Sequence, residues 1–398
     1  MMKYIVLVPD GMADYPVEKL GGKTPLDVAD TPHMDYVVKN GLLAQVTTIP
    51  ERLAPASDVA NLSIMGYDPR EFYSGRAPLE AAHLGVELTA QDVAFRCNLV
   101  TISDEKMADY SAGHISSHEA AVLIQELNKG LGSDAVKFYP GVSYRHLTVL
   151  RGYPVEELSR CLCSPPHDIL GEPIRRHLPK GKGAQVLLDL MEKSKDILSR
   201  QEINRVRLDL RENPANMIWL WGQGQKSHMP LFREKYGLTG AVISAVDLIK
   251  GIGKLIGLEV INVEGATGYY DTNYEGKAEA GLKALEHLDF VFIHVEATDE
   301  AGHNGDLRNK IACIERFDKL IVGAILDHFK SAKTDWRLMV LPDHATPVDL
   351  RKHVADKVCM AMMGKGIARN GFDRFTEEEA RKSEVHFEGH QLMDVFLR

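Results

Sequence analysis

Apolar residues along this chain gather in short runs that predict a mostly parallel β-sheet. In the first and last parts of the chain, runs rich in β-branched residues alternate with segments of helical periodicity. This alternation is typical of an α/β fold with helices on both faces of the sheet. The predicted strands lie at residues 4–8, 44–49, 239–245, 258–263, 290–295 and 337–341, and the predicted helices at 246–256, 273–287 and 309–329.

The middle of the chain has a different pattern, in which strand-like runs are separated by long polar loops rich in His, Arg and Pro. One helix is predicted to begin at Ser116, because Ser116 and Glu119 have the spacing of a capping box. We therefore expect an inserted α+β domain at residues 85–230, within an α/β domain built from residues 1–84 and 231–398. The other predicted elements of the insert are strands at 93–102, 143–150 and 217–221 and a helix at 183–200.

Composition narrows the class of protein. The formal net charge of -9 argues against general nucleic-acid binding, which needs a basic surface. No apolar run approaches the ~20 residues of a membrane-spanning helix, so we expect no membrane partner. The five cysteines are an odd number without paired spacing, which predicts reduced thiols. Because the chain also enters a strand-like run without a signal peptide, we expect a cytoplasmic protein.

Three of the predicted strands lead into acidic and histidine residues. Asp10 closes the run KYIVLVPDG, and Asp343 with His344 closes RLMVLPDH. Asp299 and His303 follow the run at 290–295 and are four residues apart, which places both on one face of a helical turn. Each such residue alone is more often a cap or a turn residue. Open α/β sheets bind ligands beyond the carboxyl ends of their strands, so together these residues predict a site for two divalent cations.

Two further residues could complete this metal site. His353 follows in LRKHVADK, although His386 and His390 are alternatives for the same role. Ser57 opens the predicted helical segment SDVANLSIMGYDP, where free N–H groups and the helix dipole favour an anion. Its simpler interpretation is an ordinary helix cap. The chain shows no GxSxG elbow, but a metal-bound serine needs no histidine base, because the cation lowers the pKa of the hydroxyl.

Several longer motifs are distributed along the chain. They are PASDVANLSIMGYDP (55–69), YSGRAPLEAAHLGVEL (73–88), DYSAGHIS (109–116), SPPHDILGEPI (164–174), WGQG (221–224), GAVISAVDLIKGIG (240–253), GATGYYDTNYEGKA (265–278), DEAGH (299–303) and PDHATPVDLRKH (342–353). These motifs resemble the cofactor-independent phosphoglycerate mutases of the archaeal type, which belong to the alkaline phosphatase superfamily. The resemblance covers essentially the whole chain. It implies an alkaline-phosphatase-like α/β core interrupted by an inserted domain that supplies much of the substrate site.

The resemblance also implies which residues do what. It favours His353 over the other two histidines, although this chain has KHVADKVCMAM where the family shows a proline-flanked strand. Lys250 matches the family's active-site lysine. No 2,3-bisphosphoglycerate would be needed. One metal ion would be held by Asp10, Ser57, Asp343 and His344, and the other by Asp299, His303 and His353.

The implied reaction moves a phosphoryl group between the 3- and 2-hydroxyls of glycerate through a phosphoserine on Ser57, with the domains closing around the substrate. Carboxylate and imidazole ligands suit Mn²⁺ or Zn²⁺, with Mg²⁺ and Co²⁺ as alternatives. In the insert, we expect Arg145, Asp168 and Arg96 to bind the small phosphorylated hydroxy acid, because arginine suits bidentate carboxylate binding. His167, on a loop stiffened by two prolines, is the candidate acid or base. The arginines could equally be ordinary solvated or ion-paired side chains.

Other functions remain open on the same scaffold. Some similar bacterial proteins are proposed to phosphorylate homoserine, but this chain has no GxxxxGK[ST] loop for a nucleotide. A metal-dependent phosphatase or sulfatase would use the same ligands. A non-enzymatic binding module would bind no divalent metal.

Overall fold

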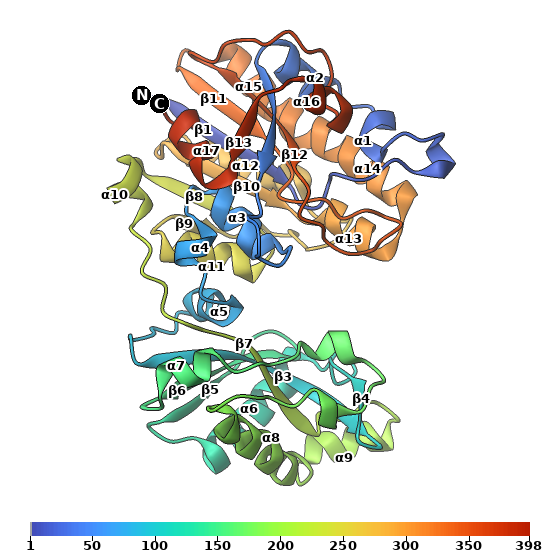
Figure 1. Cartoon of the computed structure of the whole chain (residues 1–398), viewed down its shortest axis with the longest axis vertical. Helices are drawn as coiled ribbons and strands as arrows, with labels where there is room; N and C mark the ends of the chain where they lie inside the picture. The colour runs from blue at the N-terminus through green and yellow to red at the C-terminus, as the bar shows by residue number, and fades with distance from the viewer. Residues whose placement is uncertain (1) are drawn as a thin grey trace. The chain divides into compact units, whose positions relative to one another are not determined.

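The computed structural model describes residues 2–398, which form two compact units (Figure 1). The first unit comprises Met1–Tyr73 and Met229–Arg398, and the second unit, Ser74–His228, is inserted between them. The first predicted boundary is therefore too late, because helix α5 (Arg76–Leu84) belongs to the second unit. Ala77 and Ala81 of this helix pack in one apolar cluster with side chains of the second unit's sheet. No change in composition along the sequence marks this boundary.

The first unit is built on an eight-stranded sheet in the order β13-β2-β12-β11-β1-β10-β8-β9. Its strands pair in parallel except for β12, which runs antiparallel to both of its neighbours. The predicted mostly parallel α/β fold is confirmed. The strands are β1 (Lys3–Pro9), β2 (Leu42–Thr47), β8 (Gly240–Ile243), β9 (Glu259–Ile261), β10 (Phe290–Val295), β11 (Trp336–Val340), β12 (Val358–Gly364) and β13 (His386–Glu388).

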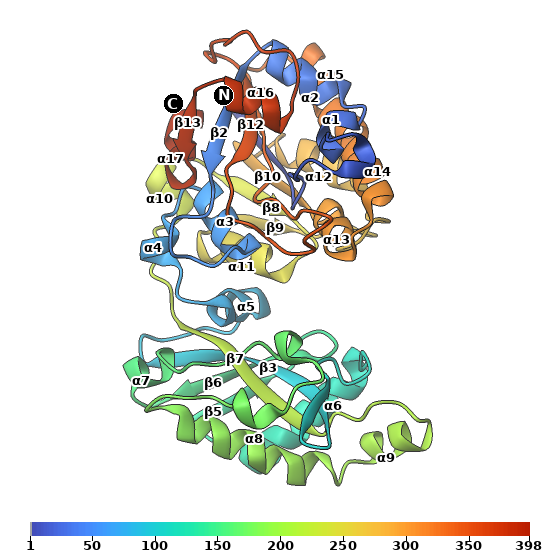
Figure 2. The ribbon, with the colours of Figure 1, turned by 45° about the vertical axis from the view of Figure 1, so that its right-hand side comes forward.

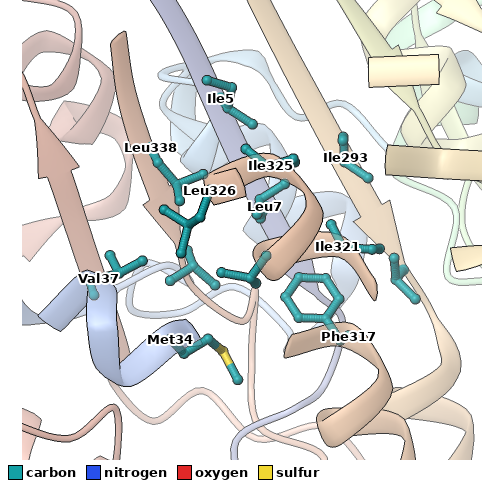
Figure 3. Packing of buried hydrophobic residues seen from close by; sticks show 14 of the residues in the cluster. Ile5, Leu7, Met34, Val37, Ile293, Phe317, Ile321, Ile325, Leu326 and Leu338 are labelled. Carbon is teal, nitrogen blue, oxygen red and sulfur yellow. The ribbon is translucent and has the colours of Figure 1, made fainter. Parts of the chain in front are cut away.

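Helices cover both faces of this sheet. Successive side chains of a strand point to opposite faces, so the apolar side chains of each strand are buried on both. Ile5 and Leu7 of β1 lie in the apolar cluster with Ile321 and Ile325 (Figure 3). Tyr4, on the other face, makes a ring contact with Phe396 of α17 at 5.8 Å. The helices of the first unit are α1 (Pro25–Val28), α2 (Pro32–Lys39), α3 (Ser57–Ile64), α4 (Pro69–Phe72), α10 (Phe232–Tyr236), α11 (Asp247–Leu255), α12 (Tyr274–Ala284), α13 (Ala297–Asn304), α14 (Leu307–Phe317), α15 (Gly323–Ser331), α16 (Glu377–Lys382) and α17 (Gly389–Phe396), with a 3₁₀ turn η1 (Glu18–Leu20).

The segment 309–329 is helical throughout, as predicted, but it is not α-helical along its whole length. A π-helical turn, η4 (Asp318–Val322), separates α14 from α15. The carboxylate of Asp318 accepts hydrogen bonds from the backbone N–H groups of His33 (3.2 Å) and Met34 (2.7 Å) in the first turn of α2. The wider turn thus satisfies donors that a helix start leaves without partners.

The second unit contains a five-stranded antiparallel sheet in the order β4-β3-β6-β5, with β7 also paired to β3. Helices α6 and α8 lie on one face of this sheet and α5 on the other (Figure 2). The capping box of Ser116 and Glu119 is present at the start of α6. This antiparallel sheet with helices is the expected α+β insert. The remaining elements are β3 (Asp92–Ser103), β4 (Lys106–Asp109), β5 (Val136–Tyr139), β6 (Arg145–Arg151), β7 (Met217–Gln225), α6 (Ser117–Leu131), α7 (Val155–Ser159), α8 (Ala184–Leu198), α9 (Glu202–Asp209), η2 (Pro166–Ile169) and η3 (Ile174–Arg176).

Within residues 2–398, no helix combines the length and the apolar character that crossing a membrane requires.

Candidate metal centre

Three adjacent parallel strands bring the candidate ligands to one edge of the first unit's sheet. β1 lies between β11 and β10 and pairs in parallel with both, so their carboxyl ends meet. Asp10 directly follows β1, and Asp343 comes shortly after β11. Asp299 lies on α13, the helix that follows β10. The strand ends therefore carry the acidic residues to the position that the sequence pattern predicts.

Among the described residues, two triplets have ligand atoms within 4.8 Å of one another. One triplet is Asp10, His294 and Asp343, and the other is Asp299, His344 and His353. We call these the Asp10 group and the Asp299 group. Each combines carboxylate oxygens with imidazole nitrogens, a donor set that suits Mn²⁺ or Zn²⁺.

The remaining predicted ligands adjoin these groups. His303 Nε2 lies 3.3 Å from Asp299 Oδ2 and 2.8 Å from His353 Nε2. His344 lies between the groups, since its Nε2 is also 3.4 Å from Asp10 Oδ1 and 3.6 Å from Asp343 Oδ2. Ser57 Oγ is 3.1 Å from the same nitrogen. All seven predicted residues thus meet at one place, with His344 in the Asp299 group and also close to Asp10 and Asp343.

The electrostatics of the Asp10 group fit a cation. Burial raises the pKa of Asp10 well above its usual value, and the charges of Asp343 and Asp299 raise it further. Asp10 Oδ1 is buried and has no hydrogen-bond partner among the described residues. A buried carboxylate without compensation is costly. The residues present therefore fit a bound divalent cation, which would supply the missing positive charge.

Ser57 is the first residue of α3, as the sequence pattern predicts. Asn61, one turn later, donates from Nδ2 to the carbonyl oxygen of Ser57 (2.8 Å) and to Asp343 Oδ2 (2.7 Å). One amide therefore fixes the start of α3 against the loop after β11. This contact holds the Ser57 hydroxyl beside His344 at a helix N-terminus, where an anionic group is favoured.

Gly11 is required by a close approach of the backbone to Asp299. Its φ is +61°, and a Cβ placed there would lie 2.5 Å from Asp299 Oδ1 and 2.6 Å from Thr346 Oγ1. The Gly11 N–H donates to Asp343 Oδ1 at 3.0 Å. A residue without a side chain thus allows both ligand groups to approach the loop after β1.

His294 belongs to the site but is missing from the sequence prediction. It lies in β10 with no exposed surface, and its Nε2 is 3.3 Å from Asp10 Oδ2. Its Nδ1 is 3.2 Å from Glu296 Oε1. A lone histidine inside an apolar strand reads as a core residue. The available signal was the alternation of His294 and Glu296 in FVFIHVE, which places two polar side chains on one face of a buried strand.

The structure separates His353 from its two alternatives. His386 Nε2 lies 2.8 Å from Thr47 Oγ1, and His390 Nε2 lies 3.7 Å from Asp68 Oδ2. His353 instead lies 3.3 Å from Asp299 Oδ1. Lys250 is half-buried on α11, a helix that packs against α3.

Two candidate substrate residues of the second unit, Arg96 and His167, pack against Trp221. The Arg96 guanidinium carbon lies 4.2 Å from the Trp221 ring centroid, and the His167 ring packs edge-on to the same indole at 5.2 Å. Arg96 is buried and paired with Glu80 at 2.9 Å. Burial lowers the pKa of Arg96, and nearby positive charges, Arg145 among them, add to this effect.

The other two candidates are exposed. Arg145 is an exposed residue of β6 whose guanidinium carbon lies 5.3 Å from the centroid of the Tyr144 ring. Asp168 Oδ1 is 3.6 Å from His167 Nε2, and its side chain is 63% exposed. Of the four candidates, Arg145 therefore offers an exposed guanidinium group that suits an anionic small molecule.

Comparison with known proteins shows the family. Residues 38–204 match the model of the 2,3-bisphosphoglycerate-independent phosphoglycerate mutases. Proteins of that name from Methanothrix thermoacetophila and Methanosarcina barkeri are 49% and 51% identical, over 100% and 96% of this chain and of each relative.

Solved structures agree with this likeness. The PH0037 protein of Pyrococcus horikoshii has a TM-score of 0.83 at 30% identity, covering 100% of this chain and 96% of that one. The cofactor-independent phosphoglycerate mutase of Thermoplasma acidophilum has a TM-score of 0.69 at 25% identity, covering 100% and 99%. The chain belongs to the family of 2,3-bisphosphoglycerate-independent phosphoglycerate mutases.

Proposed function

We propose that this protein interconverts 3-phosphoglycerate and 2-phosphoglycerate, without 2,3-bisphosphoglycerate, through a phosphoserine on Ser57. The observation that carries the proposal is the position of Ser57. Its Oγ lies 3.1 Å from His344 Nε2, which is itself 3.4 Å from Asp10 Oδ1, at the N-terminus of α3. Family membership supports the substrate, since relatives about half identical to this chain over its full length carry the name of this mutase.

Ser57 Oγ would act as the nucleophile on the phosphorus of the substrate. A bond from Ser57 Oγ to phosphorus forms while the bond from phosphorus to the glycerate oxygen breaks, and glycerate leaves as an alcohol that stays bound. The other glycerate hydroxyl then attacks the phosphoserine, and the Ser57 oxygen is released. N–H groups of the first turn of α3 favour the phosphoryl charge in both steps.

Two divalent metal ions fit the ligand groups, and we propose Mn²⁺, with Zn²⁺, Mg²⁺ and Co²⁺ as alternatives. When bound, such ions lower the pKa of a hydroxyl and neutralise charge on a transferring phosphoryl group. Asp10, Ser57, Asp343 and His344 would hold one ion. Asp299, His303 and His353 would hold the other.

The second unit would bind the glycerate part of the substrate. Arg145 is exposed and can offer a bidentate fork to a carboxylate. Arg96 would contribute charge, and Asp168 would accept from a glycerate hydroxyl. His167 would exchange a proton with the hydroxyl that leaves or attacks, and Lys250 would add positive charge near Ser57. The five cysteines are free thiols, which supports a cytoplasmic location.

An enolase-coupled assay with 3-phosphoglycerate and Mn²⁺, without 2,3-bisphosphoglycerate, tests this function. We expect turnover by the wild type and its loss in Ser57→Ala, because the nucleophile is removed. Ser63→Ala is the matched control, since Ser63 is buried in the same helix and its Oγ has no hydrogen-bond partner among the described residues. No turnover by a folded, metal-loaded wild type would reject the mutase. Phosphate release, or phosphorylation of homoserine with ATP, would then identify the alternative.

A further inference from the structure

Two lysines of the first unit have no exposed surface, Lys277 on α12 and Lys310 on α14. A buried ammonium group is costly unless acceptors surround it. Both lysines have such acceptors, and in each case the acceptors belong to segments that carry candidate metal ligands. Neither lysine is within the ligand groups themselves.

Lys277 lies behind the Asp10 group. Its Nζ is 2.9 Å from the carbonyl oxygen of His294 and 3.0 Å from Glu296 Oε2. Glu296 Oε1 in turn lies 3.2 Å from His294 Nδ1 and accepts the Ser244 hydroxyl at 2.8 Å. The opposite nitrogen of His294 is 3.3 Å from Asp10 Oδ2. A continuous path of charged and polar groups therefore runs from Lys277 to Asp10.

Glu296 connects this lysine to the His294 ring. One of its carboxylate oxygens, Oε2, accepts from Lys277, and the other, Oε1, lies next to His294 Nδ1. Glu296 therefore fixes the orientation of the His294 ring. An acceptor of this kind behind a histidine is a common outer-shell arrangement at metal sites.

Lys310 lies behind the Asp299 group. Its Nζ donates to Asp14 Oδ2 at 2.7 Å, to the carbonyl oxygen of Thr346 at 2.8 Å and to that of Ala13 at 3.3 Å. The Thr346 hydroxyl donates to Asp299 Oδ1. Lys310 thus ties the loop after β1 to the loop after β11, next to the residue that holds Asp299.

We infer that Lys277 and Lys310 are positioning residues for the metal centre, with Lys277 supporting the Asp10 group and Lys310 the Asp299 group. This inference rests on the metal centre of the proposed function but not on its substrate. The two ammonium groups hold the ligand-bearing segments in place through Glu296 with His294 and through Thr346, so that carboxylates and imidazoles face one another before an ion arrives.

The test isolates each group with a ligand substitution. Asp299→Asn leaves the Asp10 group to bind Mn²⁺, and Asp343→Asn leaves the Asp299 group. In the first background, Lys277→Met should weaken Mn²⁺ binding about 10- to 100-fold, the usual effect of an outer-shell loss. Lys310→Met should weaken it less than Lys277→Met does, because Lys310 reaches Asp299 through Thr346 and only adjoins the loop that carries Asp10. In the Asp343→Asn background, Lys310→Met should weaken Mn²⁺ binding about 10- to 100-fold, and Lys277→Met should weaken it less. Calorimetry measures the affinity, and electron paramagnetic resonance of free Mn²⁺ checks it.

Lys330→Met is the matched control, because Lys330 is an exposed helical lysine paired with an aspartate, Asp327, at 2.8 Å. It should alter Mn²⁺ binding in neither background. Unchanged affinity in folded Lys277→Met and Lys310→Met variants would overturn the inference, even if their melting temperatures fall. Equal weakening of both groups by either lysine would also overturn it.

If a lysine variant does not fold, removing both charges of its pair avoids leaving a buried unpaired charge. Lys277→Met with Glu296→Gln, and Lys310→Met with Asp14→Asn, must then show the same selective loss, and unchanged affinity would overturn the inference. Because Mn²⁺ binding is measured without phosphoglycerate, an inactive wild type that binds two ions would reject the mutase and leave this inference standing.

Discussion

The two units of this protein hold their candidate site residues in opposite ways. In the first unit, Asp343 and His344 have no exposed surface and lie within 4 Å of other ionisable groups. In the second unit, the side chains of His167 and Asp168 are 43% and 63% exposed. A buried group of carboxylates and histidines needs compensation, and this need alone points to a cation. The exposed Arg145 and His167 need none, and the buried Arg96 already has it in Glu80, so their role becomes visible only with a substrate.

The largest effect is expected from a substitution at Gly11, next to the buried ligands of the first unit. In Gly11→Ala the new Cβ would lie 2.5 Å from Asp299 Oδ1, at a φ of +61°. We expect the backbone strain to lower the free energy of unfolding by about 1–3 kcal/mol. Displacing Asp299 should weaken Mn²⁺ binding and lower mutase activity by roughly 10²-fold. Urea unfolding, Mn²⁺ titration and the coupled assay measure the three effects.

Gly22→Ala provides the control for Gly11→Ala. Its φ is +80°, and no atom lies within 4 Å of the added Cβ. Gly22→Ala should therefore lower the free energy of unfolding without weakening Mn²⁺ binding. If Gly11→Ala binds Mn²⁺ like the wild type, the close approach to Asp299 does not matter for the site.

A substitution at Arg145 tests whether an exposed residue of the second unit binds the substrate. In Arg145→Met we expect KM for 3-phosphoglycerate to rise about 10- to 100-fold, because a charge-assisted hydrogen bond contributes about 1.5–3 kcal/mol. Mn²⁺ affinity and unfolding should not change, since Arg145 is exposed and belongs to the other unit. Arg205→Met, at a 65% exposed side chain of α9, is the control. Equal KM values in the two variants would remove Arg145 from the substrate site.

The smallest expected effect concerns acid stability of the second unit. Burial lowers the pKa of His146 to about 3, whereas an unfolded histidine has a pKa of about 6.5. Below about pH 6.5 the unfolded state therefore binds a proton that the folded state excludes, and stability falls. The loss should be about 1 kcal/mol between pH 7 and pH 5.5.

His146→Gln cannot titrate, so its urea-unfolding curves in EDTA should lack this part of the pH dependence. The exposed His118→Gln should keep it. Identical pH dependence in His146→Gln and wild type would show that His146 is not the acid-sensitive group.

The sequence predicts that several candidate ligands of the first unit lie close together, because these residues follow strands. Residues such as Asp10 and Asp343 follow apolar runs, and parallel strands bring such positions together without knowledge of side-chain packing. His294 could not be found in this way, because its contact with Asp10 becomes visible only when β1 and β10 pair.

Other features depended on packing that periodicity does not record. The π-helical turn at Asp318 follows from its hydrogen bonds to α2, far away in the sequence. The position of α5 follows from the contacts of Ala77 and Ala81 with Ala94, Leu147 and Val149. In the second unit, only contact with Glu80 and Trp221 shows that Arg96 is a buried ion-paired residue.

The most direct test is to find the phosphoryl group on the enzyme. Wild-type protein with Mn²⁺ and 3-phosphoglycerate is quenched in acid during turnover, and the phosphorylated peptide is mapped by mass spectrometry. The account predicts phosphate on Ser57, absent in Ser57→Ala and retained in Ser63→Ala. Active turnover with phosphate on another residue, or with no phosphorylated residue in a rapid quench, would contradict it.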